Sequence, residues 1–131
     1  VKLLIKNQAW GDERHWLGIV DHIVGSGISP KRLILCHRGF SPNGQNNPED
    51  LRNLPDFEMA MRIKKVTDLP ILIDPSHIGG SVANVFKVAR MAKEFDFDGM
   101  MIEVHPTPFE AKSDAKQQLT FKELNSLLKT I

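Results

Sequence analysis

Four short apolar segments recur along this chain at intervals of about 30 residues, the usual length of one βα unit. They are residues 1–6, 32–36, 71–74 and 99–104, and each is rich in large aliphatic side chains, as buried strands are. Strands that are separated by helices run parallel in one sheet, with both faces of the sheet covered. The pattern therefore predicts an α/β fold made of four consecutive βα units.

The segments between these strands carry apolar residues at the three- and four-residue spacing of an amphipathic helix. We expect helices over residues 12–24, 57–66 and 81–95, with Val66 and Met91 among the inward residues. A last helix should begin at the capping box that Thr120 and Glu123 form. Residues 38–53 are rich in Gly, Pro and Asn, which predicts a long loop of the kind that often carries function.

Two architectures are compatible with this order of elements: a small open α/β sheet, or half of a (β/α)8 barrel. The chain has no G-x-G-x-x-G or G-x-x-x-x-G-K-[ST] phosphate loop, which disfavours a nucleotide-binding open sheet. Each predicted strand is followed by polar residues capable of chemistry, among them Lys6, Arg38, His77 and Glu103. Barrel strands end in this way at a catalytic face, so the barrel is favoured.

A divalent metal site is the first functional hypothesis. His77 follows the third predicted strand, Glu103 ends the fourth, and Asp114 lies in the loop after it. Carboxyl ends of parallel strands converge, and one nitrogen with two carboxylate oxygens suits a divalent cation. Asp114 alone could equally be a capping or solvated residue, and Cys36, inside an apolar strand, reads as a small buried hydrophobe.

An anion site is the second hypothesis. Lys6 and Arg38 are cations at the ends of the first and second strands, where a point charge and a planar fork of donors could hold a doubly anionic ligand. A solvated rim charge is the alternative for Lys6. His37, next to Arg38, could contact a ligand directly or support its neighbours by hydrogen bonding.

Composition excludes several classes of partner. With 17 Lys and Arg against 16 Asp and Glu, the net charge of +1 gives no reason to expect nucleic acid or an anionic membrane. No apolar run is long enough for a membrane span, and no signal peptide opens the chain. The single cysteine fits a reducing cytoplasm. Because the chain starts with Val1 inside a predicted strand, we expect this start to be a cut.

Four motifs together resemble one enzyme family. They are K-N at residues 6–7, C-H-R-G-F at 36–40, D-P-S-H-I-G-G at 74–80, and I-E-V-H-P at 102–106 with S-D-A-K-Q-Q-L-T at 113–120. In this order and spacing they resemble the C-terminal half of 3-deoxy-D-arabino-heptulosonate 7-phosphate (DAHP) synthase, in the branch related to 3-deoxy-octulosonate 8-phosphate synthase. The resemblance covers essentially the whole chain, and it implies one domain over residues 1–131 that supplies strands five to eight of a TIM (β/α)8 barrel.

The resemblance also implies roles for particular residues. It makes His77, Glu103 and Asp114 metal ligands, with Asp114 also touching the sugar-phosphate hydroxyls. Lys6 and Arg38 would hold phosphoenolpyruvate, with His37 as a neighbour, so that Lys6, Arg38 and His77 form the catalytic set. The metal would be Mn²⁺ first, with Fe²⁺, Co²⁺ or Zn²⁺ as alternatives. The implied reaction joins phosphoenolpyruvate and erythrose 4-phosphate into DAHP and phosphate, the first step of the shikimate pathway to aromatic amino acids.

The sequence lacks two motifs of the family pattern, and Gln8 follows the K-N pair where a proline is common. The G-P-C-S type motif with the family's metal-binding cysteine is absent, as is the K-P-R-[ST] motif for the aldehyde's phosphate. We therefore expect the parent protein to be the enzyme and this chain by itself to be incomplete. The alternatives are a sibling 3-deoxy-octulosonate 8-phosphate or sialic-acid-type synthase, and a non-catalytic half barrel. A half barrel exposes strand edges and an apolar sheet face, which predicts a homo-oligomer.

Overall fold

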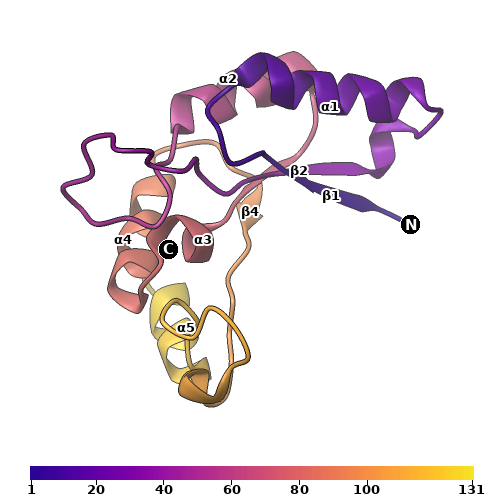
Figure 1. Ribbon diagram of the computed structural model, residues 1–131. Coiled ribbons are helices and arrows are strands. Elements are labelled where there is room, and N and C mark those ends of the chain that lie inside the picture. Colours follow the sequence, from indigo (N-terminus) through magenta and orange to yellow (C-terminus); the bar gives the residue numbers. More distant parts are fainter.

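The sheet has the predicted number of strands and the predicted direction. The computed structural model describes all 131 residues, and its strands are β1 (Leu3–Lys6), β2 (Leu33–His37), β3 (Ile71–Ile73) and β4 (Gly99–Met100). They lie side by side in the order β1-β2-β3-β4, and every neighbouring pair is parallel. Strands β1, β2 and β4 are labelled in Figure 1. A doubly wound open sheet would reverse its strand order at some point. This sheet does not, which is the behaviour of a barrel.

Four longer helices lie where the periodicity predicted them, although the one predicted over residues 81–95 ends at Ala92, and one further short helix was not predicted. They are α1 (Glu13–Gly25), α2 (Phe57–Thr67), α3 (Pro75–Gly79), α4 (Val82–Ala92) and α5 (Phe121–Leu128), with short 3₁₀ turns at Pro30–Arg32 and Pro108–Glu110. The longer helices begin at side chains that accept a backbone N–H bond, namely Asp12, Asp56, Ser81 and Thr120. The capping box of Thr120 and Glu123 is present as predicted. No helix of this chain combines the length and the apolar character needed to cross a bilayer.

The core lies on one face of the sheet. Leu33, Leu35 and Ile71 point toward α1 and α2 and pack with Trp16 and Ile63, all of them almost wholly buried. The alternate strand residues, which point the other way, belong to no core cluster, and Leu4 among them is 37% exposed. The general expectation for parallel sheets, that both faces are covered, was wrong here, because a sequential strand order places successive right-handed crossovers on the same side. The face left without helices is the apolar sheet face expected of a half barrel.

The fourth strand is shorter than predicted, ending at Met100 and not at residue 104. Its partner β3 ends at Ile73, whose carbonyl still accepts from the backbone N–H of Met101 at 2.8 Å. Beyond that point the sheet offers no partner. The backbone there pairs with Leu119 instead, whose N–H donates to Glu103 and whose carbonyl accepts from His105, both at 2.9 Å.

A short helix that the periodicity did not predict, α3, occupies the space next to β3. Asp74 caps it by accepting the backbone N–H of His77 at 3.0 Å, and Pro75 at the first helical position fits the required φ. The left-handed Gly80 (φ 72°) ends it. The structure thus turns the D-P-S-H-I-G-G segment into a one-turn helix that fixes the position of His77.

Candidate functional site

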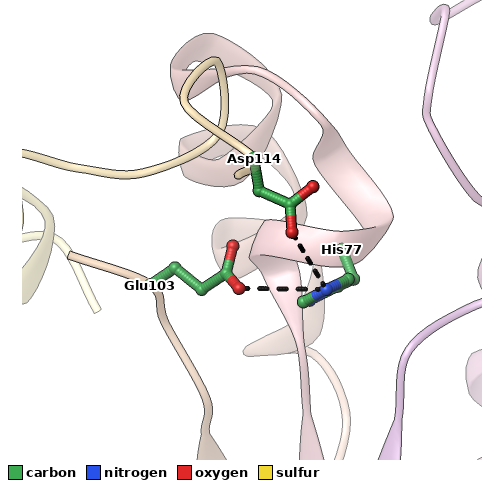
Figure 2. A group of neighbouring side chains, drawn as sticks. All are labelled: His77, Glu103 and Asp114. Carbon is green, nitrogen blue, oxygen red and sulfur yellow. Dashed lines mark ion pairs between the residues drawn. The ribbon is translucent and has the colours of Figure 1, made fainter. Parts of the chain in front are cut away.

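Three side chains converge beyond the carboxyl ends of β3 and β4. Nε2 of His77 lies 3.8 Å from Oε1 of Glu103 and 3.9 Å from Oδ2 of Asp114 (Figure 2). One possible ligand atom from each residue lies within 4.8 Å of the other two. All three side chains are partly buried, at 18%, 29% and 25% exposure respectively. The structure therefore brings together the three residues that the sequence analysis selected as ligands.

The donor set fits a divalent cation. Metal–ligand bonds of about 2.0–2.2 Å leave donor atoms about 3–4 Å apart around one ion. The two distances from His77 are within that range, so one cation could reach all three residues with small side-chain movements. One imidazole nitrogen with two carboxylates is also the mixed N/O set that divalent transition metals accept.

Asp114 is held in place by a cation from another segment. Its Oδ1 accepts a hydrogen bond from Nη1 of Arg52 at 2.6 Å, while Oδ2 faces His77. The hydrogen bond from Arg52 lowers the pKa of the Asp114 carboxyl below its usual value, so this group stays ionised in mildly acidic solution. The backbone of Asp114 has a φ of 53°. Asn and Asp tolerate this left-handed conformation better than most residues.

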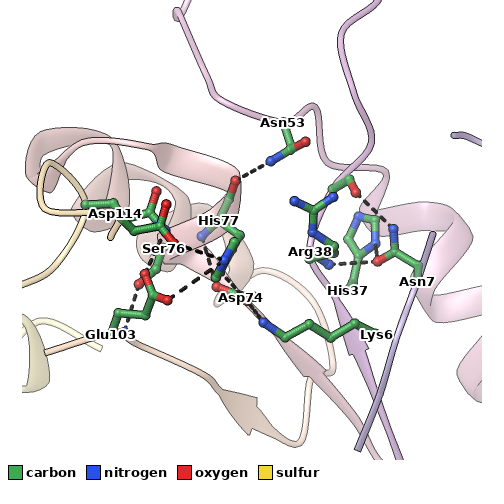
Figure 3. Close-up of polar contacts among 12 residues, drawn as sticks. Lys6, Asn7, His37, Arg38, Asn53, Asp74, Ser76, His77, Glu103 and Asp114 are labelled. Carbon is green, nitrogen blue, oxygen red and sulfur yellow. Dashed lines mark hydrogen bonds and ion pairs between the residues drawn. The ribbon is translucent and has the colours of Figure 1, made fainter. Parts of the chain in front are cut away.

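Asp74 joins the predicted anion site to the predicted metal site. This carboxylate is fully buried, and its Oδ2 lies 2.7 Å from Nζ of Lys6 and 2.9 Å from Nδ1 of His77 (Figure 3). Nδ1 of His77 is close to this carboxylate, but the angles at the contact do not make a hydrogen bond. The ion pair with Lys6 compensates the buried charge. Lys6 is thus an ion-paired residue of the site and not a free rim charge.

Arg38 carries the unpaired cation of the site. Its side chain makes no hydrogen bond or ion pair, while its backbone N–H donates to Oδ1 of Asn7 at 2.8 Å (Figure 3). Asn7 is 3% exposed and also donates to the carbonyl of Gly39 at 2.9 Å. The second residue of the K-N pair therefore fixes the backbone on both sides of Arg38, while the guanidinium itself has no partner within the chain.

His37 lies in the core and has no exposed surface. Its Nε2 accepts the backbone N–H of Asp56 at 2.9 Å, so the ring proton sits on Nδ1, which is 3.2 Å from Oδ1 of Asn7. The ring stacks on Trp16 at a centroid distance of 5.9 Å. Burial lowers the pKa of His37 to about 4, and the ring stays neutral. The geometry favours support of Asn7 over direct contact with a ligand.

Cys36 is not part of the site. The thiol is fully buried, and burial raises its pKa to about 12, so it is neither a nucleophile nor a metal ligand at neutral pH. Besides Arg52, three residues that were not predicted from the sequence also contribute. Asp74 and Asn7 do so as described above, and Ser76 accepts the backbone N–H of Glu103 on its Oγ at 2.9 Å. Asp74 could have been predicted, because a carboxylate at the end of an apolar strand is costly to bury without a partner.

Comparison with known proteins identifies the relatives of this chain. Residues 8–131 match the model of the DAHP synthetase I family. The phospho-2-dehydro-3-deoxyheptonate aldolase of Thermotoga maritima is 34% identical over 126 residues, which are 96% of this chain and 36% of that protein. The 2-dehydro-3-deoxyphosphooctonate aldolase of Burkholderia multivorans is 30% identical over 117 residues, covering 81% of this chain and 39% of that protein.

Two solved structures share the fold. The crystal structure of DAHP synthase from Thermotoga maritima matches with a TM-score of 0.85 and 34% identity, over 96% of this chain and 35% of that one. A truncated form of the Thermotoga maritima synthase matches with a TM-score of 0.83 and 32% identity, over 98% and 47%. The chain thus spans less than half the length of these relatives, and its four βα units form part of a TIM (β/α)8 barrel, as the resemblance implied.

Proposed function

The chain belongs to the DAHP synthetase I family, and we propose that it carries the metal-binding and phosphoenolpyruvate-binding part of a DAHP synthase. In this proposal residues 1–131 are one domain that supplies strands five to eight of the barrel. The observation that carries it is the convergence of His77, Glu103 and Asp114 beside two cations, Lys6 and Arg38, at the same edge of the sheet.

His77, Glu103 and Asp114 would hold a divalent cation. Mn²⁺ is the first choice, and Fe²⁺, Co²⁺ or Zn²⁺ are compatible with the same donors. When bound, the ion supplies Lewis-acid polarisation of an aldehyde oxygen. The residues themselves contribute ionised carboxylates and a fixed imidazole, since Arg52 favours the charged form of Asp114 and Asp74 lies against the far nitrogen of His77.

Arg38 and Lys6 would bind phosphoenolpyruvate. The unpaired guanidinium of Arg38 can donate two parallel hydrogen bonds to a carboxylate or a phosphate, and Lys6 adds a compact charge next to Asp74. Lys6 ends β1 and Arg38 directly follows the neighbouring strand β2, so one ligand could reach both side chains. Holding a reactant in a fixed position next to its partner contributes a large part of the rate in a condensation of two molecules.

The reaction we propose joins phosphoenolpyruvate to erythrose 4-phosphate. A bond forms between the enol methylene carbon and the aldehyde carbon, a water adds to the enol carbon, and the C–O bond to phosphate breaks. DAHP and phosphate are the products, in the cytoplasm, at the first step of the shikimate pathway. The octulosonate sibling is the second candidate, supported by the 30% identity to the Burkholderia aldolase.

Binding and turnover test different parts of this proposal. In calorimetry we expect Mn²⁺ and phosphoenolpyruvate to bind, and Arg38→Ala to lose phosphoenolpyruvate while it keeps Mn²⁺, because Arg38 lies outside the metal cluster. Phosphoenolpyruvate consumption is then followed with erythrose 4-phosphate and arabinose 5-phosphate in parallel. Consumption with the first aldehyde alone supports the heptulosonate reaction, and consumption with the second alone supports the octulosonate one.

The chain by itself is expected to bind without turnover, because the cysteine and aldehyde-phosphate motifs are missing from its sequence. A chain that binds neither Mn²⁺ nor phosphoenolpyruvate would contradict the proposal. Turnover by this chain would instead show that copies of it associate into a working site, and would overturn the third possibility, a non-catalytic half barrel.

A further inference from the structure

Each carboxylate of the candidate metal centre has one oxygen directed inward and the other held from outside. Glu103 turns Oε1 toward His77 and accepts a hydrogen bond on Oε2 from Nε2 of Gln117 at 2.7 Å. Asp114 turns Oδ2 toward His77 and accepts on Oδ1 from Nη1 of Arg52 at 2.6 Å. The outer hydrogen bonds therefore leave the inward oxygens available for a cation.

The two outer residues also bind each other. Nη1 of Arg52 donates to Oε1 of Gln117 at 2.6 Å, so a continuous chain runs from Asp114 through Arg52 and Gln117 to Glu103. Gln117 is 1% exposed and uses both ends of its amide. Its orientation is fixed by chemistry, because a flipped amide would set N–H₂ against the guanidinium and the oxygen against a carboxylate.

Arg52 lies in the long loop between β2 and α2, and this loop is also hydrogen-bonded to α3, the helix that carries His77. Nδ2 of Asn53 donates to the carbonyl of His77 at 2.6 Å, and its backbone N–H donates to the carbonyl of Ile78 at 3.2 Å. Gly80 packs directly on Arg52, since a Cβ at that position would lie 2.6 Å from the Cβ of Arg52. Arg52 and Asn53 thus connect the long loop between β2 and α2 to all three members of the cluster.

We propose that Arg52 and Gln117 are positioning residues for cation binding, and that through them the loop after β2 is coupled to the metal centre. This inference rests on the metal site of the proposed function. A flexible carboxylate loses side-chain freedom when it binds an ion, and a carboxylate already held on one oxygen loses less. Groups that hold the ligands of a metal from outside are worth about 10- to 100-fold in affinity.

The positive charge of Arg52 opposes its positioning role, so the two effects change the affinity for a cation in opposite directions. Arg52 is a cation close to the centre, and its charge by itself would weaken the binding of another cation. Its side chain is 44% exposed, so solvent screens that repulsion. If positioning dominates, removal of Arg52 weakens metal binding; if repulsion dominates, removal strengthens it.

The experiment measures Mn²⁺ affinity on the full chain without substrate, from the electron paramagnetic resonance signal of free Mn²⁺. We expect Arg52→Ala and Gln117→Met each to bind Mn²⁺ about 10- to 100-fold more weakly than the wild type. Arg52→Lys should recover part of the loss, because an ammonium can still donate to Asp114. The matched control is Arg62→Ala, which removes an arginine that pairs with Glu13 at 2.9 Å away from the site and should leave Mn²⁺ affinity unchanged.

Melting temperatures without metal separate positioning from folding. A lower melting temperature with unchanged Mn²⁺ affinity in both Arg52→Ala and Gln117→Met overturns the inference, as does tighter binding by Arg52→Ala. Gln117→Met keeps the size of a buried side chain and so protects the test against a variant that fails to fold. If the wild type binds Mn²⁺ and the variants match it, only this inference falls, whereas a wild type that does not bind Mn²⁺ removes the proposed metal site as well.

Discussion

Asp74 and Lys6, 68 residues apart in the sequence, form an ion pair of 2.7 Å in which the carboxylate is fully buried and the lysine is one-third exposed. The pair joins the ends of β1 and β3 across the intervening β2. The same carboxylate caps α3 and lies against His77. Asp74 therefore contributes to the stability of the sheet edge and to the positions of two candidate binding residues, His77 for the metal and Lys6 for phosphoenolpyruvate.

We predict that Asp74→Ala lowers stability more than Asp74→Asn. Both variants lose the ion pair, at a cost of about 1–3 kcal/mol that is moderated because Lys6 can turn to solvent. Asparagine can still accept the backbone N–H of His77, whereas alanine loses the cap and about 1 kcal/mol more. Urea unfolding measures the difference.

Asp96→Ala is the control for this pair, since it removes an ion pair with Lys64 whose carboxylate is 90% exposed. It should change stability little, because exposed pairs contribute little. Equal stability of Asp74→Ala and Asp74→Asn would show that the cap contributes nothing measurable.

His77 gives the most direct test of the metal centre. His77→Ala removes the nitrogen that faces both Glu103 and Asp114, and two carboxylates alone should hold the ion poorly. At a Mn²⁺ concentration of about 100 times the dissociation constant, the wild type should gain about 2.7 kcal/mol of stability. We expect this gain to vanish in His77→Ala and to persist in His22→Ala, which alters an exposed histidine of α1. Thermal unfolding with and without Mn²⁺ measures it, and an unchanged gain in His77→Ala would remove His77 from the ligand set.

Much of the fold could be predicted because its determinants are local. Short continuous runs of apolar residues located the four strands, and apolar residues at three- and four-residue spacing located the longer helices. The Thr120–Glu123 box located the start of α5. The same local patterns overestimated the apolar faces. Val66 and Met91 were expected inward but are 70% and 41% exposed, so they lie outside the buried faces of α2 and α4.

The convergence of His77, Glu103 and Asp114 could be predicted because the carboxyl ends of parallel strands meet at one edge. The residues that hold them could not. Arg52 and Gln117 are 65 positions apart, and a hydrogen bond between side chains on two loops leaves no periodic or spacing signal. The length of β4 could not be predicted from its own residues either, since it depends on where its partner strand β3 ends.

Self-association is a further prediction, and it follows from the open face of the sheet. Leu4, Ile34 and Leu72 alternate with the core residues and belong to no core cluster, and β1 and β4 are unpaired along their outer edges. Apolar surface next to free strand edges favours pairing of copies. Sedimentation equilibrium should give a mass above that of one chain, and Leu4→Glu should lower it. The control Val66→Glu, on the outer side of α2, should not. A wild type that sediments as a monomer would contradict the prediction.

Cys36 should be inert in the folded protein. Its thiol has a pKa of about 12 and no exposed surface, so neither thiolate nor access is available to a reagent at pH 8. We expect Ellman's reagent to react with it only after denaturant unfolds the chain, at a rate limited by unfolding. Rapid reaction in native buffer would mean that β2 opens locally around Cys36.

The free energy of unfolding should decrease as the pH is lowered from 6.5 to about 4, because of His37. Its pKa is about 4 in the folded protein against an ordinary value of 6.5, mainly because burial disfavours the charged ring. Between pH 6.5 and about 4 the unfolded state therefore binds more protons than the folded state, and stability decreases as the pH falls. Across this window His37 should lower the free energy of unfolding by about 3 kcal/mol. Above pH 6.5 and below about pH 4, the contribution of this residue no longer changes with pH.

The variant His37→Gln separates this contribution from those of the carboxylates. It is less stable at pH 7, because it loses the bond from Asp56 and the stacking on Trp16, but its stability should depend less steeply on pH within the window. His22→Gln, at an exposed position, should keep the wild-type slope. Urea unfolding at pH 7, 6, 5 and 4.5 measures the slopes. Parallel curves for His37→Gln and the wild type would mean that the buried ring accepts a proton as readily as a ring in water, which the bond from the Asp56 N–H to its Nε2 argues against.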